Sequence, residues 1–143
     1  MALAGDLEVE THGPGLYEIT RDVADWLAAN AAAARHDGVL VLSIRHTSAS
    51  LLIQENADPD VAADLADWLS RIVPRIDDPG MDWVRHTAEG PDDMPAHLRA
   101  AILPTSLTVP VRDGALSLGT WQGLYVVEHR DRPHRRRLDL TLL

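Results

Sequence analysis

Runs of apolar residues along the chain predict most of its strands. Leu7–His12 and Leu16–Thr20 are predicted as two short strands, because the Gly13–Gly15 segment between them is a strong turn signal. Val39–Arg45 is rich in apolar and β-branched residues and predicts a buried strand, followed by a strand at Ser50–Glu55. Asp113-Gly114 then predicts a hairpin turn. The C-terminal strands are predicted at Leu107–Arg112, Ala115–Trp121, Tyr125–Glu128 and Leu138–Leu142.

Apolar residues at helical spacing predict three helices. The first runs from Arg21 to about Ala34, with Thr20 as its cap. In the second, Asp58 is the cap and Pro59 takes the first helical position. Its apolar face is predicted at Val61, Leu65, Trp68, Leu69 and Ile72. The third helix is short, with Asp93 capping Pro95–Leu103.

The order of these elements predicts an α+β fold with mainly antiparallel sheets, since strands outnumber helices and many are joined as hairpins. Residues 76–93 form an acidic loop interrupted by Gly and Pro. A loop of this length in a small domain is usually functional or mobile. The length of 143 residues predicts one domain, residues 1–143.

The amino-acid composition excludes several kinds of catalytic and structural chemistry for this protein. The chain has no cysteine, and all 13 of its basic residues are arginine. Disulfides, thiolate nucleophiles and lysine Schiff bases are therefore excluded. The net charge of −9 argues against nucleic acid as a partner. The apolar runs are too short to cross a membrane, and the N-terminus does not have the pattern of a secretory signal, so we expect a cytoplasmic protein.

Polar residues gather in two segments that include histidine. The first is Arg45–Ser50, directly after the predicted buried strand, with Glu55 and Asn56 at the end of the next strand. A polar turn bonded to its own backbone is an equal alternative there. The second segment contains His86, Glu89, Asp92, Asp93 and His97. Its spacing is not a standard zinc motif, and structural histidines are the alternative reading.

Two further polar segments lie near the C-terminus. Gly119–Gly123 places Trp121 between glycines, which suits either a β-bulge or the close approach of a ligand. Arg130–Arg137 is rich in arginine. Guanidinium groups bind phosphate or carboxylate with two hydrogen bonds. The alternative is an ion-pair patch against the acidic loop, within one chain or between subunits.

In combination, these segments resemble the YjbQ family, also called the secondary thiamine-phosphate synthase family. The matching residues are HTSASL at His46–Leu51, ENADP at Glu55–Pro59, HTAEGPDDMPAHL at His86–Leu98, and GTWQG at Gly119–Gly123, with Glu128, Arg136 and Arg137. Order and spacing agree over most of the chain. The resemblance implies an α+β domain with a mainly antiparallel β-sandwich and three helices, assembled as a homotrimer.

The resemblance also implies weak thiamine-phosphate synthase activity. This reaction joins hydroxymethylpyrimidine diphosphate to a thiazole phosphate and releases diphosphate. It needs positive charge against the leaving group rather than a nucleophile. We therefore expect phosphate binding by Arg45, Arg136 and Arg137, and a divalent metal at His46, His86 and His97. The other expected site residues are Thr47, Ser48, Glu55, Asn56, Asp92, Trp121, Gln122 and Glu128, with His46 also in a catalytic role.

The nature of the metal keeps other functions open. Mg²⁺ is possible and is usual in diphosphate chemistry, but it prefers oxygen ligands, whereas imidazoles suit Zn²⁺ or another transition metal. A metal with an open position activates water, so a metal-dependent hydrolase of a small phosphorylated metabolite is the first alternative. A non-catalytic metabolite-binding trimer is the second. We expect structural roles for the remaining histidines, His12, His36, His129 and His134.

Overall fold

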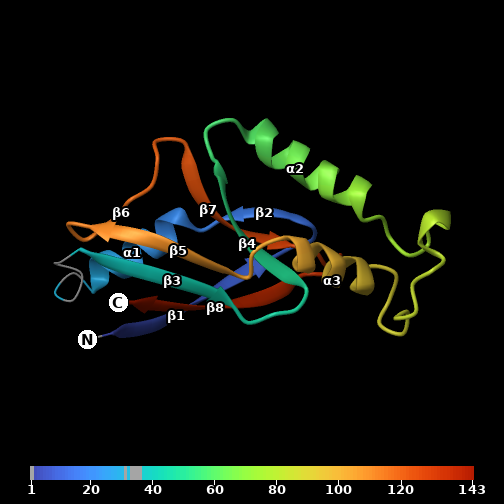
Figure 1. Cartoon of the computed structure of the whole chain (residues 1–143), viewed down its shortest axis with the longest axis horizontal. Coiled ribbons are helices and arrows are strands. Elements are labelled where there is room, and N and C mark those ends of the chain that lie inside the picture. Colours follow the sequence, from blue (N-terminus) through green and yellow to red (C-terminus); the bar gives the residue numbers. More distant parts are fainter. Residues whose placement is uncertain (1, 31, 33–36) are drawn as a thin grey trace.

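A computed structural model describes residues 2–30, 32 and 37–143, and its strands form two sheets (Figure 1). The larger sheet has the order β1-β8-β3-β5-β6, and the smaller has the order β2-β7-β4. Every pairing between these strands is antiparallel. The predicted α+β class is confirmed. The strands are β1 (Leu3–Thr11), β2 (Gly15–Glu18), β3 (Gly38–Ile44), β4 (Ala49–Glu55), β5 (Ser106–Arg112), β6 (Ala115–Leu116), β7 (Gln122–Glu128) and β8 (His134–Leu142).

The helices are α1 (Thr20–Ala29), α2 (Pro59–Ile72) and α3 (Asp93–Ile102), with a short 3₁₀ helix, η1 (Pro79–Met81). Figure 1 shows α2 lying along the outside of the molecule, and the loop that contains η1 projecting beyond the end of α3. Asp58 caps α2 as predicted, since its carboxylate accepts the backbone N–H of Asp60 at 2.9 Å. None of the helices in the described part of the chain has the length and apolar character that a membrane crossing requires.

The core contains apolar side chains from both sheets and from α1. The larger sheet contributes alternate residues of β3 and β8, and the smaller sheet contributes β4 and β7. Alternation places every second side chain of a strand on the same face, so β3 and β8 bury one face each, whereas β7 is buried on both faces. The most completely buried members include Leu40, Leu42, Leu51, Leu124, Leu138, Leu140, Val23 and Leu27. One side of α1 also packs tightly on β1, where a Cβ added at Gly5 would lie 2.3 Å from Nε1 of Trp26.

Several predicted element ends are wrong. Ile19, rather than Thr20, is the N-cap of α1, and the Thr20 hydroxyl instead accepts the N–H of Leu124 on β7 at 2.9 Å. The predicted helix end at Ala34 lies outside the described residues. Asp92, rather than Asp93, is the N-cap of α3. The strand predicted over 115–121 stops at Leu116, because the chain then turns toward β7.

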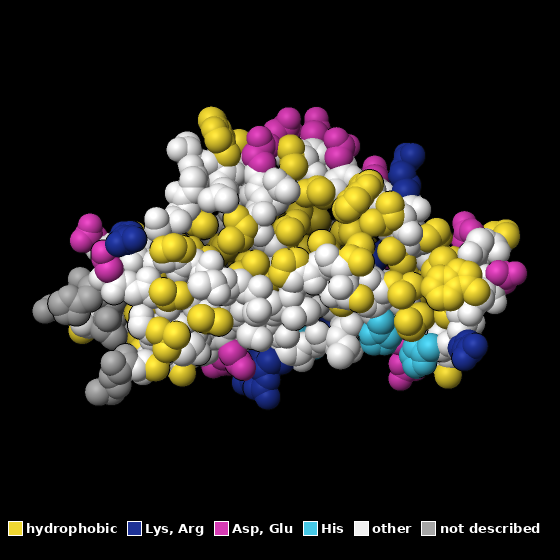
Figure 2. All heavy atoms as spheres, viewed as in Figure 1, with side chains coloured by type: hydrophobic (Ala, Val, Ile, Leu, Met, Phe, Trp, Pro, Cys, Tyr) yellow, Lys and Arg dark blue, Asp and Glu magenta, His cyan; other side chains and the backbone are white. Residues whose placement is uncertain are grey.

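The apolar face of α2 is only partly covered. Leu69 is buried, but Trp68 is 51% exposed and Ile72 is 44% exposed. Figure 2 shows acidic side chains along the outer edge of the molecule, where Figure 1 places α2, and apolar side chains below them. The helical period was therefore predicted correctly, while burial of the whole face within one chain was not.

Candidate functional site

Four polar side chains meet where the acidic loop runs into α3. His86 and Glu89 come from the loop, and Asp93 and His97 come from the first turns of the helix. Their nearest ligand atoms all lie within 4.8 Å of one another. Oδ2 of Asp93 lies 2.8 Å from Nε2 of His86 and 3.1 Å from Nε2 of His97. Two imidazoles and two carboxylates therefore surround one point, and we call these four residues the His-carboxylate cluster.

Local structure explains why the sequence brings these groups together. Asp93 and His97 are four residues apart on α3, and this spacing places side chains on the same helix face. Gly90 has φ of 102°, a left-handed conformation that favours glycine, and it turns the loop into the helix. The Nδ1–H of His97 donates to the carbonyl oxygen of Thr47 at 2.9 Å, which leaves Nε2 facing Asp93.

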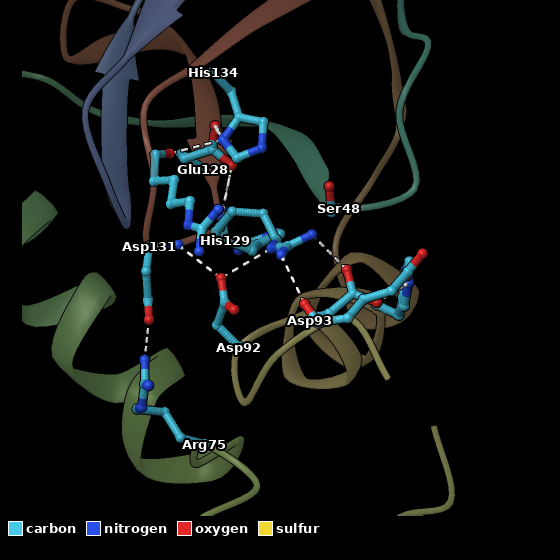
Figure 3. A network of polar contacts seen from close by, with 12 residues as sticks. Ser48, Arg75, Asp92, Asp93, Glu128, His129, Asp131 and His134 are labelled. Carbon is cyan, nitrogen blue, oxygen red and sulfur yellow. Dashed lines mark hydrogen bonds and ion pairs between the residues drawn. The ribbon is translucent and has the colours of Figure 1, made fainter. Parts of the chain in front are cut away.

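Arg130 binds both Asp92 and Asp93, the two neighbouring aspartates that are labelled in Figure 3. Its Nε donates to Oδ2 of Asp92 at 2.8 Å, and one Nη donates to Oδ1 of Asp93 at 2.6 Å. Burial alone would raise the pKa of both aspartates. Hydrogen bonds from Arg130 to Asp92, and from His86 to Asp93, outweigh burial and hold both pKa values below their usual range. Both carboxylates are therefore ionised at neutral pH.

The pKa of His86 is shifted in the opposite direction. Its hydrogen bonds to Asp93 and then Glu89 raise its pKa above the usual value. The carboxylates thus favour a positive charge at this point, whether it is a proton on His86 or a cation between the four groups. His86 and His97 face each other with ring centroids 5.7 Å apart.

His46 is not part of this cluster. Its Nε2 accepts the backbone N–H of Arg137 at 2.8 Å, so that this nitrogen is directed at β8. Burial, followed by the charge of Arg136, lowers its pKa. The ligand group seen here therefore differs from the predicted set, since His86 and His97 are joined by Glu89 and Asp93 and not by His46.

A second polar group is buried between β7 and β8. Nε and one Nη of Arg136 donate to the two carboxylate oxygens of Glu128, at 2.8 and 2.5 Å. The same guanidinium donates to the Ser48 hydroxyl at 3.0 Å, and Thr11 also donates to Glu128. Burial would raise the pKa of Glu128, but the hydrogen bonds from Arg136 and Thr11 outweigh it and lower the pKa. Arg136, only 3% exposed, is thus bound to a carboxylate of its own chain.

The other predicted phosphate-binding arginines lie at the surface. The side chains of Arg45 and Arg137 are both 61% exposed, and they form ion pairs with Asp139 at 3.7 Å and Asp6 at 3.2 Å. Arg135 lies within 3.6–3.7 Å of two glutamates of β1. The arginine-rich segment therefore forms ion pairs within the chain, in part with the acidic loop as the alternative expected, through Arg130. Its exposed arginines of β8 pair with acidic residues of β1 instead.

Four predicted site residues, Glu55, Asn56, Trp121 and Gln122, lie at the end of the smaller sheet that is far from Glu128. In the register of β4 and β7, Glu55 pairs with Gln122, whereas Ala49 pairs with Glu128. Six residues of strand separate the two ends, about 20 Å at 3.3 Å per residue. Asn56 binds the carbonyl oxygen of Trp121 through its backbone N–H at 3.0 Å, and Trp121 is 63% exposed. Within one chain, the structure does not bring Glu55, Asn56, Trp121 and Gln122 to the His-carboxylate cluster.

The four remaining histidines have different surroundings. His129 is buried, and its Nε2 lies 2.9 Å from the Ser50 hydroxyl. His134 bonds the carbonyl oxygen of Arg132 at 2.7 Å. His12 is exposed, and its backbone N–H donates to the Tyr17 hydroxyl at 2.9 Å. His36 lies outside the described residues.

Glu89 and Asp93 were expected in the polar segment around His86, but they were not predicted as metal ligands. The spacing of four residues between Asp93 and His97 was the available signal, because it is typical of paired ligands on one helix face. Ion pairs between the arginine-rich segment and the acidic loop were the alternative interpretation of that segment, and Arg130 forms such pairs with Asp92 and Asp93. The individual partners of Arg130 had no local signal, since it lies 37 residues away from Asp93 along the chain.

The sequence of this chain is similar to a known protein family. The family model described as "UPF0047 protein YjbQ-like" matches residues 5–143. UPF0047 protein sll1880 of Synechocystis is 44% identical over 136 residues, covering 92% of this chain and 85% of that protein. YjbQ of Escherichia coli O157:H7 is 42% identical over 125 residues, with 87% and 83% coverage.

Solved structures show the same fold. The hypothetical protein APE1520 of Aeropyrum pernix has a TM-score of 0.83 at 30% identity, covering 99% of this chain and 98% of that one. The conserved hypothetical protein TT1486 of Thermus thermophilus has a TM-score of 0.80 at 36% identity, with 97% and 99% coverage. These matches extend over nearly the whole length on both sides. The chain therefore belongs to the YjbQ family, UPF0047.

Proposed function

We propose that this protein is a metal-dependent enzyme that hydrolyses a small phosphorylated metabolite, with the His-carboxylate cluster holding the metal. The observation that carries the proposal is the convergence of His86, Glu89, Asp93 and His97 within 4.8 Å. Two imidazoles with two carboxylates suit Zn²⁺ and similar transition metals. Such an ion, when bound, would supply positive charge for the phosphate and lower the pKa of an attacking water.

Contacts around the cluster support this role. The Nδ1–H of His97 donates to a backbone carbonyl, the arrangement that orients metal-ligating imidazoles. Arg130 fixes Asp93 and shares its charge between Asp92 and Asp93. With these residues in place, the chain needs little rearrangement to receive a cation.

A pocket beside His86 would receive the organic part of the substrate. It encloses about 380 Å³ and is lined by Trp83, Val84, Arg85, His86 and Met94. Figure 2 shows histidine side chains next to an apolar patch at this end of the molecule. Trp83 is 60% exposed, and its indole N–H donates to the carbonyl oxygen of Gly80 at 3.1 Å, which holds the ring. A ring held beside the cluster is suited to stacking on a planar group.

Metal analysis combined with a phosphatase assay tests the proposal. Untagged protein is stripped with a chelator, reloaded with Zn²⁺ or Mn²⁺, and assayed for phosphate release from a panel of phosphate esters. We expect about one equivalent of metal, lost in His97→Ala and Glu89→Gln together with activity. Exposed His12→Gln is the matched control. Equal metal content in wild type and His97→Ala would contradict the proposal.

Thiamine-phosphate synthesis is the second candidate, and the carboxylates of the cluster favour it. Glu89 and Asp93 supply the oxygen ligands that Mg²⁺ prefers, and the pocket of Trp83 is suited to a heterocycle. The test is formation of thiamine phosphate from the two precursors with Mg²⁺. Under this candidate, Trp83→Ala raises the KM for the pyrimidine substrate, while Trp68→Ala leaves it unchanged. No product from wild-type protein would exclude it.

The homotrimer remains part of the proposal. Trp68 and Ile72 on α2 expose apolar surface. Burial of this surface against another copy of the chain would favour association. In such an assembly, the Trp121 end of one chain and the His-carboxylate cluster of another are free to meet. Light scattering after size exclusion gives the mass directly, and a monomer at micromolar concentration would contradict this part.

A further inference from the structure

A second pocket, separate from the His-carboxylate cluster, lies between α2 and the turn after β7. It encloses about 520 Å³ and is lined by Pro14, Ala66, Ser70, Pro74, Arg75, Asp77, Asp78, Pro79, Arg99 and Asp131. We call it the Arg99 groove. Its volume is in the usual range for small-molecule sites, about 300–1,000 Å³. None of the residues predicted for the site lines it.

Arg99 is the unusual member of this groove. It is 7% exposed, and one Nη donates to the carbonyl oxygen of Val73 at 2.7 Å. Its Nε is buried without a hydrogen-bond partner, and among the described residues no carboxylate forms an ion pair with it. Buried guanidinium groups are normally paired, because an unpaired buried charge opposes folding. An acceptor-rich ligand would supply what the chain itself does not.

The charges around Arg99 restrict the ligand. Arg75 is already engaged by Asp131 and Asp77, so that Arg99 is the cation left for an incoming anion. Asp77 and Asp78 line the same groove and repel a dianion such as phosphate. A ligand that carries a carboxylate and, a few atoms away, a cationic group matches both charges of the groove. Its carboxylate would face the Arg99 guanidinium, and its cationic group would face the aspartates.

The groove and the cluster lie on different sides of α3. His97 and Arg99 are two residues apart on this helix, which is about 200° of rotation. They are nevertheless connected, because Asp131 of the groove donates its N–H to Asp92 at 2.9 Å (Figure 3). Arg130 in turn joins Asp92 to Asp93. The groove is thus a separate site attached to the same polar network.

We propose that the Arg99 groove binds a small zwitterion of the α-amino acid type, with Arg99 binding its carboxylate and Asp78 facing its ammonium group, since Asp77 already pairs with Arg75. This site is independent of the metal proposal and adds a second ligand to the protein.

Calorimetric titration with the common α-amino acids tests the proposal, with acetate and inorganic phosphate as comparison probes. We expect saturable binding of at least one amino acid and weaker binding of acetate, which lacks the ammonium group. Arg99→Met lowers the affinity by at least about tenfold, while Arg71→Met, an exposed arginine outside the groove, leaves it unchanged.

Three results would overturn the proposal: no amino acid binds, binding is the same in Arg99→Met, or phosphate alone binds. If Arg99→Met does not fold, Ser70→Tyr fills the groove from the exposed face of α2, and retained binding in that variant contradicts the site. His97→Ala separates this proposal from the metal proposal, because it removes the metal ligand and leaves amino acid binding intact.

Discussion

His129 gives the protein a stability that depends on pH. It directly follows β7, is 1% exposed, and has Nε2 at 2.9 Å from the Ser50 hydroxyl. Burial, followed by the charge of Arg99, lowers its pKa to about 4. In the unfolded chain a histidine has a pKa of about 6.5. The folded state therefore holds His129 neutral over a range in which the unfolded state protonates it.

The coupling between folding and proton binding gives the sign and the size of this pH dependence. Because the folded pKa is the lower one, the unfolded state binds more protons between about pH 6.5 and pH 4, and stability falls as pH falls through this window. Each pKa unit corresponds to about 1.4 kcal/mol, so the contribution at pH 5 is a loss of roughly 2 kcal/mol relative to pH 7.5. Below about pH 4 the loss reaches its limit of roughly 3 kcal/mol.

Urea unfolding followed by tryptophan fluorescence measures this loss. Wild type, His129→Gln and the exposed control His12→Gln are compared at pH 7.5, 6 and 5. We expect wild type and His12→Gln to lose stability in parallel and His129→Gln to lose roughly 2 kcal/mol less by pH 5. His46, whose pKa is also lowered, contributes equally to all three proteins. The reasoning is refuted if His129→Gln follows the same pH dependence as wild type.

Three further predictions concern stability. Arg136→Met removes the partner of buried Glu128 and should cost about 3–5 kcal/mol in urea unfolding, whereas a purely ligand-binding Arg136 would leave the midpoint unchanged. Asp58→Ala removes the cap of α2 and should lower the unfolding free energy by about 1 kcal/mol, with Asp64→Ala, an exposed residue of the same helix, as the control. Gly5→Ala should lower the melting temperature, since its Cβ overlaps Trp26 and such overpacking costs about 1–3 kcal/mol; an unchanged melting temperature would show that Trp26 moves freely.

The features predicted correctly from sequence are those set by neighbouring residues. Asp58 and Pro59 start α2 because capping is a matter of two or three adjacent positions. Asp113-Gly114 forms the hairpin turn between β5 and β6, with φ of 50° and 78° at the two residues. The element order of the α+β fold follows from such local signals combined with periodicity.

The composition of the site depends on contacts that the sequence does not encode locally. His46 and His97 were expected to act together, but the register of β8 presents the N–H of Arg137 to His46. From the sequence, the charge of Arg136 was likewise expected to bind phosphate, but in the folded chain Arg136 on β8 of the larger sheet binds Glu128 on β7 of the smaller sheet. The family resemblance indicated the segments that carry these residues, while contacts between distant parts of the chain decide which of their side chains lie together.

The contact between Arg130 and Asp93 also sets how this carboxylate can bind a cation. Oδ1 of Asp93 receives the guanidinium at 2.6 Å, and only Oδ2 is directed at the two imidazoles. Asp93 is therefore restricted to monodentate ligation. A chelating carboxylate would fill two coordination positions of a bound ion, whereas Asp93 would fill one and would leave room for an oxygen from outside the protein. Arg130 would in this way limit the number of protein ligands without contacting the ion.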